Sequence, residues 1–577
     1  MIETDVLIVG SGPSGASAAA LLSSYSVSNI VVTKYKWLAD TPRAHITSQR
    51  TMEIFDELGV IERVMAHAVP NQYIGNSVIC QTLVSEEIGR IKSWGAAPNR
   101  VSEYLLNSPF EVCDIPQNYV EPILIEKAAA SGSIIKFCTE FISFEQDLSH
   151  VISTVKDRVS GEIYQIKSRY LVGADGGRSS IAESVGLPFS GRMGVAGSIN
   201  IVFKADLTRF VAHRPSALFW MLNPEARVGG LSVGLLRMVR PWNEWLCVWS
   251  YDISRPPPKV DEEKALEIIK KIIGEDVDDI SIKNISTWTV NDAYAKEYSK
   301  GKVFCVGDAV HRHPPNNGLG SNTSIQDSYN LAWKLAYVVK GWATERILET
   351  YSEERVPVGR EIVRRANKSL SETKELLTVF SDGEDEAALD IEVIRGNSER
   401  NRDARTSLAR SVLEKSNEFN FIGIESNISY KSSLTIADDE GHLVSDGDLE
   451  NVNSIFHSKI SPGARFPHVW LLYKGKEVSS LSLIGRGSFS LITGASGEHW
   501  IKAAEEWSHR KGIPLSLYQV SMRGEIQDIY FDLANRCDFH EGSAILIRPD
   551  GYIAWIGLPD AAGGEELSEV LFKILGK

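Results

Sequence analysis

The sequence predicts an α/β protein of several domains, and three observations along its 577 residues predict this. Near the N-terminus, a short apolar strand runs into a glycine-rich turn and then a helix of small residues. The middle of the chain is rich in tryptophan and alternates apolar with polar residues, as antiparallel sheets often do. After about residue 430, apolar runs alternate with an amphipathic helix, which predicts a small third α/β unit.

Composition places the chain among globular proteins that carry an acidic surface. Hydrophobic residues make up 43% of the chain, charged residues make up 24%, and the formal net charge is −14. A chain without a basic excess offers little to a phosphate backbone, so no nucleic-acid partner is expected. The length exceeds what one hydrophobic core usually serves and predicts about two to four domains.

The six cysteines are scattered, with no CxxC pair and no ligand-like cluster. Neither a disulfide framework nor a zinc site is therefore expected, and we expect reduced thiols packed in a cytoplasmic protein. No stretch is long and apolar enough to span a bilayer, and no basic segment and apolar run of the secretory kind begin the chain. We expect no association with membranes.

The N-terminal segment has the pattern of a dinucleotide-binding unit. Residues 5–9 predict a buried parallel strand, residues 16–22 a helix, and residues 30–32 a second strand. Glycines in the connecting turn permit a sharp bend, close approach of a pyrophosphate and tight packing of helix on strand. The helix start adds oriented N–H groups and the positive end of a dipole. The expected phosphate-binding residues are Gly10, Gly12, Pro13, Ser14 and Gly15.

One residue usual in such units is missing. An acidic residue normally ends the second strand and binds the ribose, whereas Thr33 and Lys34 stand here. The ribose must be recognised differently, or by the Thr33 hydroxyl. A lone glycine motif does not choose between NAD and FAD, and an ordinary glycine turn without a ligand is the alternative.

Two later strand ends carry further glycine and aspartate pairs. A strand from Leu171 leads to Asp175-Gly176, and a strand at 303–306 leads to Gly307-Asp308 and a turn rich in glycine, proline and asparagine. A long helix follows, with apolar residues at helical spacing. Together with the first turn, these segments resemble the GxGxxG, DG and GD motifs of the single-component flavoprotein aromatic hydroxylases.

Residues 1–375 resemble the phenol hydroxylase and 2,4-dichlorophenol 6-monooxygenase branch of that family. The similarity is carried by Thr41-Pro-Arg43-Ala-His45, by Gln49-Arg-Thr51 and by the segment 307–315. The resemblance implies FAD as the cofactor, NADPH or NADH as a transient reductant, O₂, and a small phenolic substrate. It implies hydroxylation ortho to the ring hydroxyl through a flavin C4a-hydroperoxide.

The resemblance also assigns cofactor roles by position. Asp308 would bind the ribityl chain, Pro314 would lie near the oxygen-reacting face of the flavin, and the helix after the turn would point at its N1–C2=O edge. Ala182 stands where the family has an arginine, which weakens an argument for NADPH. For Gln117, a solvated helix start is the alternative. The remaining positions matched to FAD contacts are Arg43, Gln117, Asp175, Gly318, Leu319, Gly320 and Asn322.

Oxygenation of a phenol needs a base, because phenolate is far more electron-rich than phenol, and it needs water excluded. His45 is the candidate base, since it falls where phenol hydroxylases have a catalytic aspartate and an imidazole of pKa ~6.5 accepts protons near neutrality. Equally, His45 could hold the loop and Arg43. Tyr294 is a second candidate to contact the substrate hydroxyl. Trp220, Met221 and Trp249 are expected either to line an aromatic pocket or to belong to the core.

The expected domains follow from these assignments. An FAD-binding Rossmann-like domain comprises 1–72, 99–190 and 285–375, and a substrate-binding antiparallel-sheet domain comprises 73–98 and 191–284. A charged helical connector spans 376–429. Residues 430–577 resemble the thioredoxin-like third domain of the phenol hydroxylase branch, without a CxxC pair, and the family habit implies a homodimer.

Other functions stay open at this point. A flavin monooxygenase that tailors a larger natural product, by hydroxylation, epoxidation or Baeyer–Villiger oxidation, shares the cofactor. A flavin-binding module without catalysis would show no NAD(P)H oxidation stimulated by substrate. A halogenase is disfavoured, because Trp242-Asn-Glu-Trp245 continues with Leu-Cys rather than with the halogenase pattern. His311 and His313 lack metal-ligand partners and are expected to shape their turn.

Overall fold

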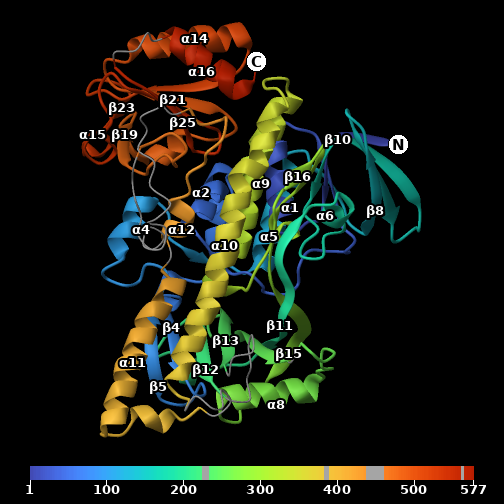
Figure 1. Cartoon of the computed structure of the whole chain (residues 1–577), viewed down its shortest axis with the longest axis vertical. Coiled ribbons are helices and arrows are strands. Elements are labelled where there is room, and N and C mark those ends of the chain that lie inside the picture. Colours follow the sequence, from blue (N-terminus) through green and yellow to red (C-terminus); the bar gives the residue numbers. More distant parts are fainter. Residues whose placement is uncertain are drawn as a thin grey trace.

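The computed structural model describes residues 1–223, 233–251, 253–381, 389–420, 422–436, 460–559 and 564–576. Three units follow one another along the long axis of the molecule (Figure 1). The unit with the N-terminal strands lies in the middle, an antiparallel sheet lies below it and the C-terminal unit lies above it. The long helix α10 (Arg346–Thr378) runs beside the middle unit and reaches toward both others.

The middle unit is built on an eight-stranded, mostly parallel sheet. The carboxyl-terminal halves of its central strands are buried and largely apolar, as expected for strands covered on both faces. Helices α1 (Pro13–Ser24), α5 (Gln117–Ala130) and α9 (Gly320–Val339) belong to the same unit. The strand path is β16 (Ser299–Lys300), β17 (Val303–Cys305), β10 (Ile163–Gly173), β1 (Ile2–Val9), β2 (Asn29–Val32) and β7 (Ile134–Lys136), with β9 (Val151–Asp157) on β10 and β8 (Thr139–Gln146) on β9.

The parallel register sets the carboxyl ends of the motif-bearing strands side by side. Val9 pairs with Gly173 on one side and with Val32 on the other, and Gly173 pairs with Cys305. Backbone hydrogen bonds continue past the strands, from the Ala174 N–H to the Val9 carbonyl at 2.8 Å. Open parallel sheets bind ligands at this edge. The ends of the three strands that carry the glycine motifs therefore meet at one edge of the sheet.

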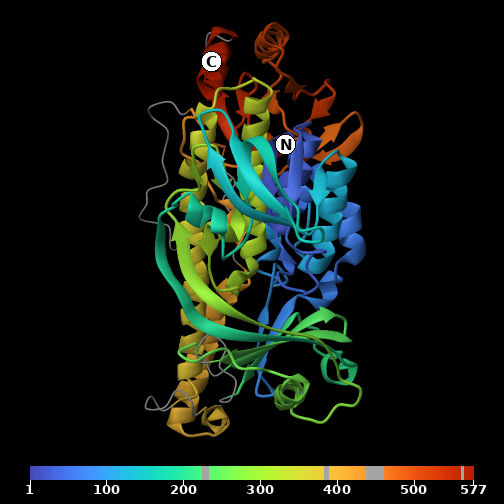
Figure 2. The same cartoon turned by 90° about the vertical axis from the view of Figure 1, so that its right-hand side faces the viewer.

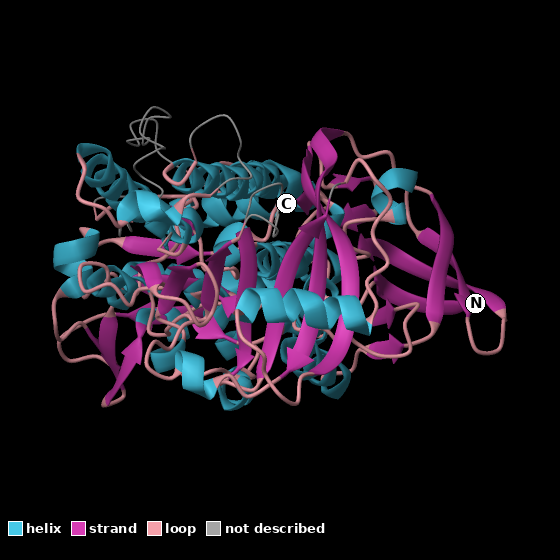
Figure 3. Cartoon of the chain, turned by 90° about the horizontal axis from the view of Figure 1, so that it is seen from below, coloured by secondary structure: helices cyan, strands magenta, loops and turns pink. Residues whose placement is uncertain are grey.

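The second sheet is antiparallel apart from one parallel pair, and long curved strands link it to the middle unit (Figure 2). Helix α8 (Glu262–Ile273) crosses its outer face (Figure 3), begins at the N-cap Asp261 and ends at the left-handed Gly274. The strand order is β18 (His311–Arg312), β15 (Ser281–Ala295), β11 (Phe189–Lys204), β14 (Glu244–Tyr251), β13 (Val233–Arg240), β12 (Leu218–Leu222), β4 (Asn76–Cys80) and β5 (Glu87–Lys92).

Short helices connect these units. The expected charged connector contains α11 (Glu399–Lys415), which a Ser398 capping box begins, and α12 (Ile422–Ser426). The acidic run at 382–386 lies outside the described residues. The remaining short helices of the first half are α2 (Gln49–Glu57), α3 (Ile61–His67), α4 (Val101–Asn107), α6 (Ser180–Ser184) and α7 (Thr208–Val211).

The C-terminal unit contains a four-stranded and a three-stranded sheet. The first has the order β22 (Leu515–Gln519), β21 (Phe489–Thr493), β24 (Ala544–Ile547) and β25 (Ile553–Gly557), and only β21 and β22 are parallel. The second has the order β20 (Lys476–Ser479), β19 (Trp470–Tyr473) and β23 (Ile526–Gln527). The α-helices among its described residues are α14 (Glu498–Lys511), α15 (Asp532–Cys537) and α16 (Gly564–Leu575).

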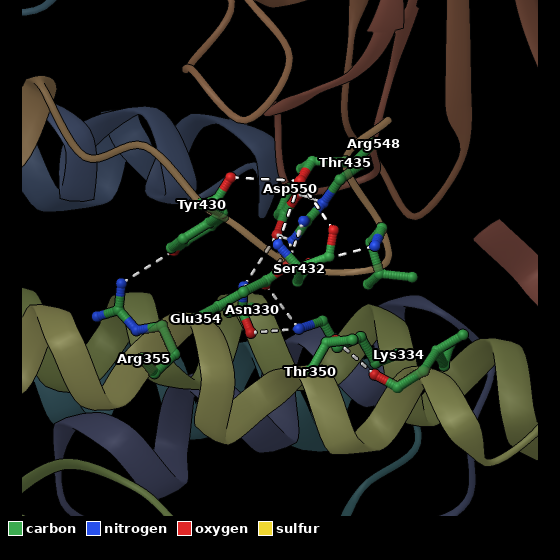
Figure 4. A network of polar contacts seen from close by, with 12 residues as sticks. Asn330, Lys334, Thr350, Glu354, Arg355, Tyr430, Ser432, Thr435, Arg548 and Asp550 are labelled. Carbon is green, nitrogen blue, oxygen red and sulfur yellow. Dashed lines mark hydrogen bonds and ion pairs between the residues drawn. The ribbon is translucent and has the colours of Figure 1, made fainter. Parts of the chain in front are cut away.

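Buried ion pairs join this unit to the middle one (Figure 4). Arg548 contacts Glu354 of α10 at 2.6 Å and Asp550 at 2.6 Å, and Lys334 of α9 contacts Glu354 at 2.8 Å. All four side chains are at most 1% exposed. Two cations therefore face two carboxylates out of water, an arrangement that is stable only when each charge keeps its partners.

Two further properties of the described chain bear on its class. None of the described helices has the length and apolarity that crossing a membrane requires. All six cysteines are free thiols, and five of them are buried.

Candidate active site

In the first glycine turn, two of the glycines have no space for a side chain. Gly10 has φ +109°, and a Cβ placed there would overlap the Ala174 carbonyl oxygen; a Cβ on Gly15 would overlap the Gly10 carbonyl. Helix α1 begins at Pro13 with no side-chain cap on Gly12. Its first N–H groups are therefore available to an anion, as at other phosphate-binding helix starts.

The GD turn lies against the first turn. Gly307 has φ +64°, and a Cβ there would come within 2.7 Å of Ser324 Oγ and 3.0 Å of Ser14 Oγ. The Ser328 hydroxyl donates to the Ser14 carbonyl at 2.8 Å, which ties α9 to α1. Asp308 projects an exposed side chain from this junction. The position suits the expected contact of Asp308 with the cofactor's sugar chain.

A buried aspartate holds the GD turn from α9. Asp327 accepts from the Gly307 N–H at 3.0 Å and from His311 Nε2 at 2.8 Å, and Arg355 Nε contacts its other oxygen at 2.7 Å. Burial would raise the pKa of Asp327, but Arg355 and His311 hold it below its ordinary value. His311 therefore has a structural partner, consistent with the expectation that it shapes the turn.

His313 follows in the same turn, beside the start of α9. Its Nδ1 lies 2.6 Å from the carbonyl of the buried Pro314, and its ring lies 3.5 Å from where a Cβ on Gly320 would sit. Burial and the neighbouring His311 lower the pKa of His313 to about 4. His313 is accordingly neutral at pH 7 and donates its Nδ1–H to Pro314.

The start of α9 is open, and Asn322 fastens a second segment beside it. No side chain caps this helix, and Gly318 precedes it with φ +68°. The Asn322 amide donates to the carbonyls of Gly318 at 2.7 Å and Ile46 at 2.9 Å and accepts from the Ser48 N–H at 2.9 Å. Asn322 thus fixes segment 46–48 against the helix, while Leu319 is buried.

Two other expected cofactor residues make contacts within the protein. Thr33 is buried at the end of β2, where its N–H donates to the Lys136 carbonyl at 3.0 Å. Asp175 accepts from the Ser179 hydroxyl at 2.5 Å and from the Ile181 N–H at 3.3 Å, and so caps the start of α6. The backbone around both residues lies at the ligand-binding edge of the sheet.

Gln117 and Arg43 belong to two segments that a backbone hydrogen bond joins, from the Gln117 N–H to the Ala44 carbonyl at 2.8 Å. Gln117 is the first residue of α5 and donates to Glu121 at 2.5 Å. Glu121 also accepts from the Ala39 N–H at 2.8 Å, and burial raises the pKa of Glu121. Arg43 is exposed. Sequence reasoning missed Glu121, although its place one helical turn after Gln117 could have indicated it.

His45 is paired with a buried aspartate that the sequence did not reveal. Strands β3 (Ile46–Thr47) and β6 (Cys113–Asp114) pair, which places His45 Nδ1 at 2.8 Å from Asp114 Oδ2. The His45 side chain is 14% exposed, and Asp114 is fully buried. Because a carboxylate on Nδ1 selects the Nδ1–H tautomer, Nε2 keeps its lone pair for a proton.

Arg237 of β13 is the third ionisable group of this site. Its Nη1 donates to the carbonyls of Pro42 at 2.6 Å and Arg43 at 2.9 Å. Among the described residues, its Nε and Nη2 have no hydrogen-bond partner, and neither has the buried Asp114 Oδ1. Burial lowers the pKa of Arg237 to about 10, so the guanidinium stays charged at neutral pH. Unpaired buried donors are costly, which makes them candidates to bind a ligand.

The pKa of His45 is set by opposing neighbours. Burial lowers it below its ordinary value, Arg237 lowers it further, and Asp114 raises it. The net direction is downward. His45 is therefore neutral at pH 7, which is the form that a general base requires.

Aromatic side chains surround this group. The Trp94 ring stands edge-on to His45 with centroids 6.5 Å apart, Phe419 is 5.6 Å from Trp94, and Trp220 is 6.5 Å from Phe419. Trp94 and Phe419 were not expected from the sequence. Their separation along the chain gives no local signal of this contact.

The alternation of side chains along the strands places the three expected pocket residues on different faces of the sheet. Trp220 pairs with Leu235, and Arg237 lies two residues further on β13, so Trp220 and Arg237 share one face of the sheet. Met221, the neighbour of Trp220, points to the other face. Met221 and Trp249 are buried in the core that α8 covers. They lie apart from the face that carries Arg237.

Tyr294 lies on β15, opposite His311 of β18, and is partly exposed. The described residues show no hydrogen bond or ring contact between Tyr294 and His45. The structure therefore connects His45 with Trp220 through the rings of Trp94 and Phe419, whereas Tyr294 pairs with His311 of the GD turn.

Comparisons with known proteins agree with this geometry. Residues 3–366 match the family model described as FAD binding domain, and residues 459–577 match the model described as aromatic-ring hydroxylase, C-terminal. The chain is 43% identical to 2,4-dichlorophenol 6-monooxygenase of Delftia acidovorans, over 100% of this chain and 98% of that protein. It is 43% identical to phenol 2-monooxygenase of Pseudomonas sp. (strain EST1001), over 96% of this chain and 90% of that protein.

The solved structures give the same result at the level of the whole chain. The flavin-dependent monooxygenase PieE, solved with FAD and substrate, superposes with a TM-score of 0.93 and 36% identity over 100% of this chain and 99% of that one. The resemblance noted from the motifs is confirmed, and FAD is the cofactor. The chain belongs to the family of FAD-dependent aromatic-ring hydroxylases and is a flavoprotein monooxygenase.

Proposed function

We propose that this enzyme hydroxylates a phenolic ring ortho to its hydroxyl, with NAD(P)H and O₂. One observation carries the proposal: a neutral histidine, backed by a buried aspartate and faced by an arginine with unpaired donors, directly precedes Ile46, whose carbonyl accepts a hydrogen bond from Asn322 at the start of α9. The relatives named as phenol and 2,4-dichlorophenol monooxygenases support the choice of a phenol.

The chain's own residues would handle the proton of the substrate. FAD, when bound and reduced, supplies oxygen activated from O₂. His45 Nε2 accepts the phenol proton, and Asp114 orients the ring and stabilises the imidazolium that forms. The Arg237 guanidinium favours the phenolate over the phenol. Because Arg237 also opposes a positive charge on His45, Asp114 is needed to keep the transfer favourable.

Burial and aromatic packing would protect the reaction from water. Trp94, Phe419 and Trp220 form an apolar wall near His45. Such a wall excludes water that would otherwise divert the activated oxygen, and it packs well against a ring. We propose that Pro314 would lie near the oxygen-reacting face of the flavin and that Tyr294 would lie at the margin of the substrate pocket. Met221 and Trp249 belong to the core on the other face of the antiparallel sheet.

The cofactor is proposed to contact residues from all three motifs. The first turn would bind the pyrophosphate, Asp308 the sugar chain, and the open N–H groups at the start of α9 the pyrimidine edge of the flavin. The residues proposed for FAD are Gly10, Gly12, Pro13, Ser14, Gly15, Thr33, Arg43, Gln117, Asp175, Asp308, Pro314, Gly318, Leu319, Gly320 and Asn322.

We also propose that the C-terminal unit is thioredoxin-like and that the enzyme is a homodimer. The thioredoxin-like assignment is supported by the strand order β22-β21-β24-β25, which has one parallel pair, and by helices α14 and α16. The unit contains no CxxC, so it would not act through a dithiol. Light scattering on the purified protein tests the second proposal, and a monomer mass would contradict it.

A substrate screen tests the proposed reaction. The purified enzyme is loaded with FAD and supplied with NADPH or NADH and a panel of substituted phenols under ¹⁸O₂. We expect phenol-dependent NAD(P)H oxidation and a catechol product that carries one ¹⁸O atom. Stimulation only by large polycyclic substrates would favour the tailoring alternative, and FAD binding without any stimulation would leave a flavin-binding module.

A further inference from the structure

A small cavity beside the proposed site is bordered by residues that the mechanism does not use. It lies between the starts of α2 and α9, helix α4 and helix α12, and it holds about 50 Å³ of space. Trp94, Phe419 and Leu319 form part of its wall. The cavity therefore shares residues with the aromatic wall near His45. A space of this size accommodates a few water molecules rather than a second substrate.

Glu425 differs from another polar residue of the cavity, Gln49, in how its hydrogen-bonding atoms are used. Gln49 uses both ends of its amide: it donates to the carbonyls of Tyr104 at 2.9 Å and Phe110 at 2.6 Å, and it accepts from Asn107 at 2.8 Å. Glu425 receives both of its hydrogen bonds on Oε1. Within the part of the chain that the structure describes, Oε2 has no partner. One carboxylate oxygen is thus fully engaged, and the other borders the cavity.

The two donors to Glu425 come from the start of helix α2 and from helix α9. The Ser48 hydroxyl donates at 3.1 Å, and the Gln326 amide of α9 donates at 2.9 Å. Ser48 is the N-cap of α2, and its N–H is held by Asn322 near the start of α9. Ser48 is therefore held by two hydrogen bonds, one from its N–H to Asn322 and one from its hydroxyl to Glu425. Segment 45–48, which carries His45, is fixed through this residue.

We propose that Glu425 is a positioning residue of the active site, which holds Ser48 against α9 and thereby fixes the segment that presents His45. This inference rests on the proposed role of His45. It assigns to the connector between the sheet and the C-terminal unit a part in the chemistry. The connector supplies the carboxylate, and the middle unit supplies both donors.

The surroundings of Glu425 make the Ser48–Glu425 hydrogen bond depend on pH. Burial raises the pKa of Glu425 to about 7; its hydrogen bonds and Arg355 of α10 act against this, and Glu53 of α2 adds to it. Tyr104 of α4 also faces Glu425. A carboxylate accepts hydrogen bonds more strongly than a neutral acid. The hold on Ser48 should strengthen as the pH rises through about 7.

Three variants test the proposal in the full-length, FAD-loaded enzyme. Glu425→Ala removes the hydrogen bond that holds Ser48 and should lower kcat/KM for the best phenol by about tenfold, the factor expected for roughly one lost hydrogen bond to a charged group. Glu425→Gln keeps an acceptor oxygen and should recover part of that loss. Ser48→Ala, combined with Glu425→Ala, should cost less than the sum of the two single losses, because both changes remove the same Ser48–Glu425 hydrogen bond. Glu62→Ala, an exposed carboxylate on α3, is the control and should match the wild type.

The pH profile supplies a readout that a purely structural role would not move. The wild type should show an ionisation near pH 7 that Glu425→Gln lacks, while the lower ionisation of His45 stays. A Glu425→Ala enzyme with wild-type kcat, KM and pH profile would overturn the proposal, and so would independent, additive losses from Ser48 and Glu425. If no phenol is oxygenated at all, the proposed function fails. The flavin absorption spectrum, titrated in wild type and Glu425→Gln, then decides on Glu425 alone.

Discussion

His45 owes its behaviour to two charged neighbours that pull its pKa in opposite directions. Asp114 raises the pKa through a 2.8 Å contact, and Arg237 lowers it, while burial sets the overall downward direction. A general base is most useful when its pKa lies near the working pH. The two neighbours therefore tune one property, and removing either should move the pH dependence in a known direction.

Removing the charge of Asp114 should weaken the base. In Asp114→Asn the cause that raises the pKa of His45 is lost, so the pKa falls further. Activity needs neutral His45 and is lost as the pH falls through that pKa. The acid limb of kcat/KM should therefore shift to lower pH, and the plateau should fall by about 10²-fold, as for loss of general-base assistance. A pH–rate profile with an unmoved limb and plateau would contradict the pairing.

Removing Arg237 should have the opposite effect on the same limb. Arg237→Met takes away a cause that lowers the pKa of His45, so the acid limb should move to higher pH. The KM for the phenol should rise, because the cation that favours phenolate is gone. Steady-state kinetics across pH 5–9 measure both effects. A shift in the same direction as Asp114→Asn would show that the charges do not act through His45.

The sequence could suggest His45 but not its partners. His45 falls within a recognisable motif, whereas Asp114 is 69 residues away and reaches it only because β3 and β6 pair. Arg237 is still more distant, and its contacts are with backbone carbonyls. Alternation along β13 could have placed Arg237 on the face of Trp220, had the strand order been known. Side-chain partners across strands depend on tertiary structure that no local pattern encodes.

At the scale of elements, local signals located strands and helices well. Among the apolar runs expected after residue 430, residues 489–493 and 544–547 are β21 and β24, and the expected amphipathic helix is α14 at residues 498–511. Buried strands and amphipathic helices carry their own periodicity, so a single sequence suffices. The roles of side chains at helix starts were harder to predict from the sequence. Asn322 stands at the start of α9 but binds segment 46–48.

The contact between α1 and α9 at the GD turn gives a test at this scale. Gly307→Ala would place a Cβ 2.7 Å from Ser324 Oγ and 3.0 Å from Ser14 Oγ, so both hydroxyls would have to turn away and the junction of the two helix starts would loosen. FAD bridging both starts should bind at least tenfold more weakly, since separated donors no longer face one ligand together. Fluorescence titration of the apoenzyme with FAD measures this.

A matched glycine separates packing from backbone strain. Gly59 has φ +68°, close to that of Gly307, and nothing lies within 4 Å of a Cβ placed there. Gly59→Ala should cost about 1 kcal/mol of stability, as a left-handed alanine does, and leave FAD affinity unchanged. Equal loss of FAD affinity in both variants would show that strain, not contact between α1 and α9, explains the result.

At the scale of the molecule, buried charges make the C-terminal unit part of one folded body. Arg548 contacts Glu354 across 194 positions of sequence, and Arg50 of α2 donates to the Asp550 carbonyl at 2.5 Å. Arg50 also contacts Glu53, which Arg465 of the C-terminal unit contacts in turn. Sequence analysis predicted a third unit but not this junction, because ion pairs between distant segments leave no periodic pattern.

Breaking this junction should destabilise the whole enzyme. Arg548→Met leaves Asp550 and Glu354 buried with one cation between them, a change that costs about 3–5 kcal/mol. Arg63→Met, which removes an exposed partner of Glu126, should cost no more than about 1 kcal/mol. Denaturant unfolding followed by both flavin fluorescence and far-ultraviolet circular dichroism measures the difference. Separate transitions for the two signals would mean that the C-terminal unit unfolds independently.

The same junction should govern stability in acid. Burial opposes the charge on Glu354, but Arg548 and Lys334 hold the pKa of Glu354 below its ordinary value. Between the folded and the unfolded pKa, the unfolded chain binds more protons, so this stabilisation is present above about pH 4.3 and is lost as the pH falls. In Arg548→Met the pKa of Glu354 rises toward its ordinary value, and less stability remains to be lost. Its unfolding free energy should therefore change less between pH 6 and pH 3.5 than that of the wild type, and an equal or steeper change would place the acid sensitivity elsewhere.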